Sequence, residues 1–184
     1  SYITAIKNSQ KSVKINLGSD KVLTSQLNSK ASASVASDQA QKVVDGDILD
    51  HSSWTGKNYP CWLRLDFEML SQVSGVKIFS GCLAYAYYPS TEGSVKDFEL
   101  QYLDGGKWKR AMPPIKDSPR FTGEDPEFGI EYKFDPVVTN SIRLYITGTN
   151  DPGTRVSSPK IPIVPEQERS VHIREIKIYG IEVQ

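Results

Sequence analysis

The segment from Asp45 to Trp54 concentrates oxygen-bearing side chains that could bind a metal ion. Carboxylates stand two residues apart around Gly46, and hydroxyls follow at Ser52 and Ser53. Oxygen ligands of this kind can converge on Ca²⁺. The spacing is not that of an EF-hand, because no Glu stands at the twelfth position and no flanking helices are predicted. A solvated turn with Asx caps is the alternative interpretation. Glu175, on a distant predicted strand, is a further candidate ligand.

Aromatic side chains gather in two predicted loops. These are Tyr85, Tyr87 and Tyr88 in one loop, and Trp54 and Tyr59 in the other. Flat rings can pack on the C–H faces of sugars, and tyrosine hydroxyls can bond to sugar hydroxyls. Alternatively, the rings fill the end of the fold, which is the interpretation we favour for Trp54. We expect at least one of the three neighbouring tyrosines to be exposed. Basic residues do not cluster around these rings, which disfavours stacking on nucleic acid.

Sequence motifs for catalysis are missing. The two histidines, His51 and His172, stand far apart, and the chain contains no HExxH, GxSxG, P-loop or zinc-spaced cysteine pair. Acidic residues are scattered, so spacing alone does not exclude a glycosidase pair of carboxylates, but no pattern indicates one. We therefore expect a domain that is not itself an enzyme.

The two cysteines leave two interpretations open. Cys61 and Cys82 stand at the outer ends of two successive strand-like runs. If those runs form a hairpin that turns near residues 71–72, the two side chains face each other and a disulfide is possible. Two buried free thiols are the default expectation. Two cysteines are in any case too few for a disulfide scaffold.

The composition is that of an ordinary globular domain. The 184 residues suggest one domain, which can bury roughly 70% of its unfolded surface. Lys+Arg and Asp+Glu are both 22, so no net charge attracts nucleic acid or anionic lipid. The 38% of hydrophobic residues argues against disorder. No apolar run approaches the ~20 residues of a membrane span. Because the chain starts at Ser1 without Met or a leader, we expect a processed protein or an excised module.

Apolar and polar residues alternate with a period of two along most of the chain. The clearest runs are residues 62–67, 97–102, 130–134 and 142–146. Turn sequences separate the runs, including Asp104-Gly105-Gly106 and Asp135-Pro136. A short helical turn is expected within 38–44, and no longer helix. Many short strands with Gly/Pro turns predict a β-sandwich.

The last predicted strand changes phase. Val171 and Ile173 have one parity, whereas Ile176 and Ile178 have the other. A β-bulge near residues 174–175 would bring both pairs to the same face. Alternatively, the first pair covers a neighbouring loop.

Two segments lack a clear strand pattern. Residues 147–170 carry four prolines and predict a long loop, which is often functional. Residues 1–30 contain one plausible strand, Val13–Asn16, and are otherwise polar. We expect residues 1–30 to be an N-terminal extension or an extra strand.

Nine short segments, in their order along the chain, carry a family resemblance. They are ASAS (31–34), VVDG (43–46), SW (53–54), WLRLDF (62–67), VSGVKI (73–78), VKDFELQY (95–102), GKW (106–108), IRLYIT (142–147) and IREIKIYG (173–180). The set resembles a coagulation factor 5/8 type C (discoidin-like) domain, and is most similar to bacterial family 32 carbohydrate-binding modules. The resemblance implies an all-β, galactose-binding-like jelly-roll β-sandwich over residues 31–184, with about five strands on three.

The resemblance also implies a structural Ca²⁺ near one end of the sandwich. Carried over to this chain, its ligands are Asp45, Asp47, Ser52 and Glu175, together with backbone carbonyls between residues 42 and 53. The family commonly has Asn in place of Asp47 and Thr in place of Ser52. In this interpretation the ion ties the turn to the last strand and stabilises the loops, and does no chemistry.

Loops at one end of the sandwich bind ligands in the domains that this chain resembles. Here they correspond to the residues that follow Ser34, to 81–94 and to 147–170. We predict that the ligand is a glycan, either a galactose-like sugar or a polysaccharide. The predicted binding residues are Tyr85, Tyr87, Tyr88, Asn150 and Arg155. The Arg that often follows a Tyr-x-Pro-like step in the family is absent after Tyr88-Pro89.

These expectations describe a non-catalytic carbohydrate-binding module that targets a secreted or surface glycan-degrading protein to its substrate. We expect a monomeric module at an extracellular, cell-surface or periplasmic location, joined to the catalytic domain of a glycoside hydrolase, lyase or sulfatase. Membrane insertion is disfavoured because residues 81–94 contain no Lys or Arg. The alternative is a protein-interaction, adhesion or spacer domain of a cell-surface protein. A large flat apolar patch would favour that alternative.

Overall fold

The computed structural model describes residues 22, 28–83, 93–120, 125–153 and 163–183. Its elements are β1 (Lys30–Ala33), η2 (Ser37–Val44), β2 (Trp54–Gly56), β3 (Cys61–Ser80), β4 (Val95–Asp104), β5 (Lys107–Arg110), β6 (Ile130–Thr149), η3 (Glu166–Glu168) and β7 (Val171–Glu182). All strand pairs are antiparallel. Within the described ranges, no helix has the length and apolar character needed to cross a membrane. The all-β class and the helical turn within 38–44 are confirmed.

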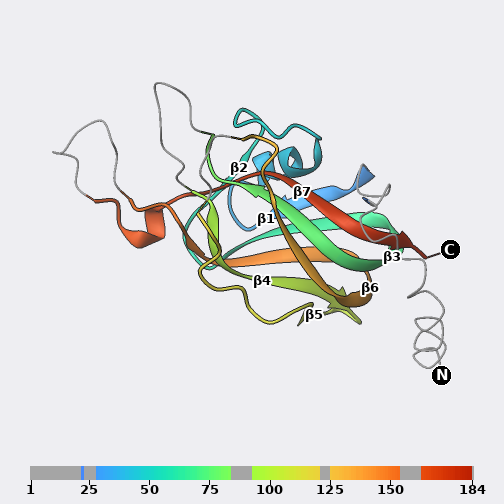
Figure 1. The fold of residues 1–184 in the computed structure, drawn as a ribbon. Helices are drawn as coiled ribbons and strands as arrows, with labels where there is room; N and C mark the ends of the chain where they lie inside the picture. Colours follow the sequence, from blue (N-terminus) through green and yellow to red (C-terminus); the bar gives the residue numbers. More distant parts are fainter. Residues whose placement is uncertain (1–21, 23–27, 84–92, 121–124, 154–162, 184) are drawn as a thin grey trace.

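Two long strands, β3 and β6, pass from one layer of the sandwich to the other (Figure 1). Residues 61–66 of β3 pair with β1 and with residues 141–146 of β6, whereas residues 71–78 pair with β7 and with residues 130–139 of β6. Strands β4 and β5 extend the first layer, and β2 pairs with β7 at the edge of the second. The predicted jelly-roll β-sandwich is confirmed, and the short β2 widens its smaller layer.

Near residues 68–70 the chain bends from one layer of the sandwich to the other and does not form a hairpin within one layer. The register of β3 shifts between Asp66 and Ser71, and the intervening Glu68, Met69 and Leu70 are exposed. The hairpin considered for this region is therefore wrong: both halves belong to β3, and its two ends meet at the same end of the sandwich. Cys61 and Cys82 are not joined by a disulfide; Cys61 is buried, whereas Cys82 is partly exposed.

A second expected turn also lies inside a strand. Asp135 and Pro136 belong to β6, where the register shifts between the pairs Val73–Val137 and Gly75–Lys133. Proline cannot donate a ladder hydrogen bond, so it occupies this irregular step. The Asp104-Gly105-Gly106 turn is confirmed, since it joins β4 to β5 and both glycines have positive φ.

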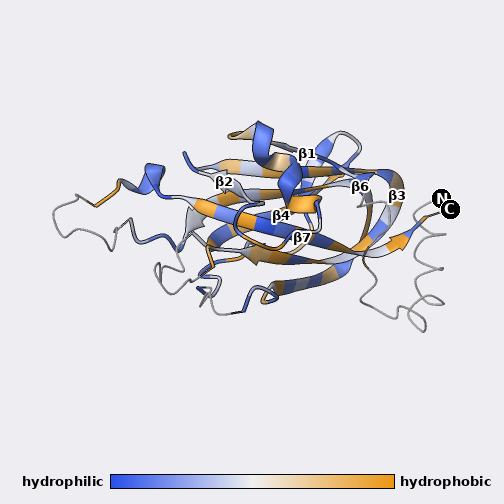
Figure 2. Cartoon of the chain, turned by 90° about the horizontal axis from the view of Figure 1, so that it is seen from above, coloured by the Kyte–Doolittle hydropathy of each residue, from blue (hydrophilic) through white to orange (hydrophobic). Residues whose placement is uncertain are grey.

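The core is formed by alternate residues of both layers, which appear as alternating bands in Figure 2. Leu63, Leu65 and Phe67 of β3 face Ile176 and Ile178 of β7 in one buried cluster. Burying each such side chain contributes about 1.5–3 kcal/mol. Trp54 is also completely buried, and its Nε1–H donates to the carbonyl of Val35 at 2.9 Å. Its interpretation as a core residue is therefore confirmed.

A β-bulge in β7 explains the change of phase in the sequence. Phe79 of β3 pairs with Glu175, and the next residue, Ser80, pairs with Ile173, so Arg174 is the extra residue. The predicted bulge is confirmed. As a result Ile173, Arg174, Glu175 and Ile176 are all buried, and two charged side chains enter the end of the sandwich where the loops gather.

Little of the N-terminal extension lies within the described residues. Val22 forms an isolated bridge with Tyr179 of β7, and β1 begins at Lys30. The strand considered at Val13–Asn16 lies outside the described residues. The boundary near residue 30 stays a prediction.

Candidate functional site

Backbone hydrogen bonds join several loops at one end of the sandwich, called here the loop end. Gly81 donates to the carbonyl of His172 at 2.8 Å, and His172 donates to that of Gly93 at 2.7 Å. Asn150 donates to the carbonyl of Ser94 at 2.8 Å. The ends of β3 and β6 and the starts of β4 and β7 therefore lie side by side here.

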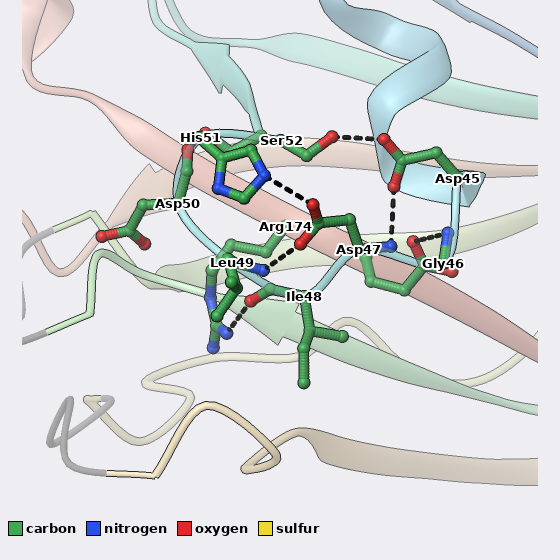
Figure 3. A network of polar contacts seen from close by, with 11 residues as sticks. Asp45, Gly46, Asp47, Ile48, Leu49, Asp50, His51, Ser52 and Arg174 are labelled. Carbon is green, nitrogen blue, oxygen red and sulfur yellow. Dashed lines mark hydrogen bonds and ion pairs between the residues drawn. The ribbon is translucent and has the colours of Figure 1, made fainter.

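The acidic turn, residues 45–53, is folded by its own carboxylates (Figure 3). Asp45 accepts hydrogen bonds from the backbone N–H of Asp47, at 2.8 Å, and from the hydroxyl of Ser52. Asp47 accepts the N–H of Leu49 at 2.8 Å and lies 2.6 Å from Nε2 of His51. Such side-chain bonds to backbone two residues ahead are typical of Asx turns.

Asp50 links the acidic turn to the next loop. Its two carboxylate oxygens accept the backbone N–H of Leu83 at 2.9 and 3.0 Å. The hydroxyl of Ser53 donates to the Asp50 carbonyl at 3.0 Å, a local bond near the end of the turn. The acidic turn therefore holds the start of the segment in which the sequence places the three tyrosines.

Glu175 reaches the acidic turn from β7, a long way along the chain. Its side chain is only 4% exposed, and Oε2 accepts the N–H of Gly46 at 3.2 Å. Burial raises the pKa of Glu175 to about 8, and the negative charges of Asp45 and Asp47 act in the same direction. The structure thus brings the four predicted metal ligands to one turn: Ser52 contacts Asp45, Glu175 contacts Gly46, and Asp47 faces His51.

The chemistry of the acidic turn fits a hard cation. Asp45, Asp47, Ser52 and Glu175 all present oxygen, the ligand type that Ca²⁺ prefers. A dication would also offset the burial of the Glu175 carboxylate beside other negative charges. In the part of the chain that the structure describes, three or more His, Cys, Asp or Glu side chains are nowhere grouped to hold a metal on their own. Hydroxyl and backbone oxygens would therefore have to complete a site.

Arg174 is the residue at this end that sequence reasoning missed. It is completely buried, and its Nε donates to the carbonyl of Gly81 at 3.1 Å. Its Nη1 donates to the carbonyls of Ile48, at 2.5 Å, and Pro126, at 3.1 Å. One guanidinium therefore ties three separate loops together. The only signal in the sequence is the change of phase in the last strand.

A small polar pocket of about 80 Å³ opens beside these loops. It is lined by Tyr59, Lys96, Asp97, Gly148, Thr149, Glu166 and Arg169. The hydroxyl of Tyr59 donates to the carbonyl of Arg169 at 2.8 Å, and burial raises the pKa of Tyr59. Of these residues, only Tyr59 was singled out by its type. The others come from three separate segments, and their meeting depends on strand register that sequence patterns do not show.

The predicted sugar-binding residues are only partly placed by the structure. Asn150 lies at the loop end, where its Nδ2 donates to Oγ of Ser94 at 3.0 Å and to the carbonyl of Ser118 at 3.1 Å. Its amide thus connects three segments. Four other residues lie outside the described residues: Tyr85, Tyr87, Tyr88 and Arg155. Their role in binding sugar stays a prediction.

Comparison with known proteins shows the fold. No family model matches the chain, and no curated protein matches it. Among solved structures, a chitosan-binding module from a chitosanase/glucanase of Paenibacillus sp. IK-5 is similar, with a TM-score of 0.59 and 15% identity over 87% of this chain and 100% of that one. The family 32 module of Clostridium perfringens NanJ, solved with galactose, has a TM-score of 0.58 and 16% identity over 86% and 98%.

A third similar structure is an F5/8 type C domain from Bacteroides fragilis. Its TM-score is 0.59 at 15% identity, over 90% of this chain and 99% of that one. The chain therefore has the discoidin-like β-sandwich fold shared by F5/8 type C domains and family 32 carbohydrate-binding modules.

Proposed function

We propose that this domain is a non-catalytic carbohydrate-binding module that targets a secreted or surface glycan-degrading protein to its substrate through the loop end. The observation that carries the proposal is the likeness in fold, over nearly the whole of each chain, to modules named for binding chitosan and galactose. At this level of identity the likeness concerns the fold, so the ligand and the parent protein belong to the proposal.

The pocket beside the loop end offers the chemistry that a sugar needs. Lys96 and Arg169 supply hydrogen-bond donors, Asp97 and Glu166 supply acceptors, and Tyr59 supplies part of the wall. Sugar hydroxyls both donate and accept, so a mixed lining of this kind suits them. A pocket of about 80 Å³ leaves most of a polysaccharide chain outside it. Little area is buried, and we expect weak monovalent affinity that neighbouring modules strengthen through avidity.

Calcium has a structural role in this proposal. Asp45 and Glu175, with Asp47 and Ser52, would hold the ion, which supplies positive charge where the carboxylates gather. Asp50 fixes the neighbouring loop by accepting the N–H of Leu83. Through these contacts the turn stabilises the start of one of the loops that we expect to meet the sugar.

A glycan array, probed with and without EDTA, tests the function. We expect binding to at least one glycan, confirmed by calorimetry, and about fivefold weaker binding for Lys96→Met and Glu166→Gln in the pocket. Lys107→Met is the matched control, because Lys107 is exposed on β5 and does not line the pocket. If no glycan binds, or if the pocket variants bind as tightly as the control, the pocket is not the sugar site.

The targeting role needs a separate measurement on the parent protein. Deletion of this domain should reduce retention on an insoluble preparation of the recognised polysaccharide without changing hydrolysis of a short soluble substrate. Equal retention with and without the domain would contradict targeting.

A further inference from the structure

The outer side of the larger layer carries a set of aromatic and arginine side chains that the proposed function does not use. We call this set the arginine–aromatic face: Trp62 and Arg64 on β3, Arg143 and Tyr145 on β6, and Trp108 on β5. Each of these residues is partly exposed, whereas their sequence neighbours Leu63, Leu65 and Leu144 lie in the core. The five side chains therefore share the solvent side of the layer that contains β4 and β5.

Rings and guanidinium groups alternate across this face. Arg64 pairs in register with Arg143, and Trp62 with Tyr145 in the adjacent row. The guanidinium carbon of Arg143 lies 4.3 Å from the centre of the Trp108 ring and 5.5 Å from that of Tyr145. That of Arg64 lies 5.2 Å from the Trp108 ring. One cation therefore lies between two rings, with a second cation beside it.

The charges on this side of the layer are not balanced within it. Arg64 contacts Asp66 at 2.7 Å. Arg110, also on β5, contacts Glu99 at 2.7 Å. Arg143 donates instead to the neutral amide oxygen Oε1 of Gln101, at 2.9 Å from Nε and 2.5 Å from Nη2. No carboxylate of a described residue lies within ion-pair distance of Arg143.

Arg64 and Arg143 face each other across the β3–β6 pair. Two like charges in this position destabilise a strand pair. Burial lowers the pKa of Arg143, and the positive charge of Arg64 contributes in the same direction, whereas Tyr145 and the carboxylate of Glu99 act against it. An anionic group bound between the two guanidiniums would relieve this repulsion. The planar fork of arginine matches a carboxylate with two parallel hydrogen bonds.

We propose that the arginine–aromatic face is a second glycan-binding surface, which binds a polysaccharide built from uronic acids. The C–H faces of the sugar rings pack on Trp62, Trp108 and Tyr145, and the carboxylates accept hydrogen bonds from Arg143 and Arg64. This surface lies on the flat side of the sandwich and is separate from the pocket at the loop end. It goes beyond the proposed function, because either surface can bind without the other.

A polysaccharide fits this face better than a protein partner does. Protein interfaces need a closely packed apolar centre. Here the groups beside the rings are polar: Gln101, Glu99 and the arginines. Within the described ranges, exposed large hydrophobic side chains lie elsewhere: Met69 and Leu70 are where β3 crosses between the layers, and Ile163 precedes η3.

Calorimetry and affinity electrophoresis with polygalacturonate and alginate test the proposal, with neutral galactan as the comparison. We expect binding to at least one acidic polymer that weakens between about 50 mM and about 500 mM NaCl. Arg143→Gln and Trp108→Ala should each weaken it about tenfold. Lys107→Gln is the matched control, because Lys107 is exposed on β5 next to Trp108 and does not belong to the arginine–aromatic face, and it should change affinity less than about twofold.

Further variants keep the test decisive. If Arg143→Gln fails to fold, as thermal melting would show, Arg143→Lys retains the charge without the planar fork and should still weaken binding several-fold. Lys96→Met in the loop-end pocket should leave the affinity for acidic polymer unchanged. The proposal is overturned if neither acidic polymer binds, if Arg143 and Trp108 variants bind as the control does, or if the neutral galactan binds this face equally well.

Discussion

Two arginines, on two strands that both pair with β3, show how the same side chain can stabilise the fold in one place and, as we propose, bind a ligand in another. Arg174 of β7 is completely buried, and its acceptors are the carbonyls of three loops. Arg143 of β6 is partly exposed, stacks on two rings, and donates to a neutral amide. The first guanidinium has backbone acceptors in place, whereas the second lies where a carboxylate can reach it. The nature of the acceptors distinguishes the two roles better than burial alone.

The largest effect that this comparison predicts is the loss of stability on substitution of Arg174. Replacing it with Met leaves the carbonyls of Gly81, Ile48 and Pro126 without their donor in a buried site, so we expect the free energy of unfolding to fall by about 3 kcal/mol. Urea denaturation measures this loss. Arg174→Lys keeps the charge but cannot reach the three carbonyls as one planar group. Its free energy of unfolding should therefore lie between those of the wild type and Arg174→Met. A loss below about 1 kcal/mol for Arg174→Met would contradict its role in holding the loops.

The second largest effect concerns the neighbour of Arg174. With Ca²⁺ at about 100 times its dissociation constant, the wild type should gain about 2.7 kcal/mol of stability. Glu175→Gln should lose most of that gain, because it removes a negatively charged ligand. Without Ca²⁺ the same variant should be at least as stable as the wild type at neutral pH, because the raised pKa of Glu175 means that its carboxyl must take up a proton on folding, a cost that the neutral amide of Gln does not carry. Thermal melting with Ca²⁺ and with EDTA measures both.

Two results would contradict the calcium proposal. One is a melting temperature of the wild type that Ca²⁺ does not change, in protein first stripped by EDTA. The other is an equal response to Ca²⁺ in wild type and Glu175→Gln. Glu168→Gln is a suitable control, because Glu168 is exposed on η3 and belongs to no part of the acidic turn.

The sequence predicted the layers well because their signal is local. Alternation at residues 62–67 and 142–146 identifies the inward side chains, and the change of phase in the last strand predicts the bulge that the register shows. The sequence also selected Asp45 and Glu175 as partners, but only through a family resemblance. A contact across more than a hundred residues has no periodic signal of its own.

The features that the sequence did not predict depend on the pairing register of the strands and on the places where strands bend between the layers. The run 61–80 has the pattern of two strands, yet it is one strand whose exposed residues 68–70 lie where it crosses. The meeting of Arg64, Arg143 and Trp108 requires the pairing of β3 with β6 and of β4 with both β5 and β6. Each residue alone is an ordinary outward-facing position of a strand. Only the order of the strands makes them neighbours.

A smaller effect is expected inside the acidic turn. Ser52 is buried and donates to Asp45, so Ser52→Ala should destabilise the Ca²⁺-free protein by about 1 kcal/mol. Ser53→Ala is the matched control, since the Ser53 hydroxyl donates to a carbonyl of the same turn from a more exposed position. Urea denaturation in EDTA compares the two. A larger loss for Ser53→Ala would mean that the Ser52–Asp45 bond is not what closes the turn.

The smallest expected effect on stability is at Arg143, and it sharpens the contrast with Arg174. Arg143→Gln removes a stacked guanidinium but also removes its repulsion with Arg64, so the free energy of unfolding should change by less than about 0.5 kcal/mol. Because salt screens the repulsion, the variant should be most stable relative to the wild type at low ionic strength. Urea denaturation at two salt concentrations measures both. A loss as large as that of Arg174→Met would show that Arg143 serves the fold and not a ligand.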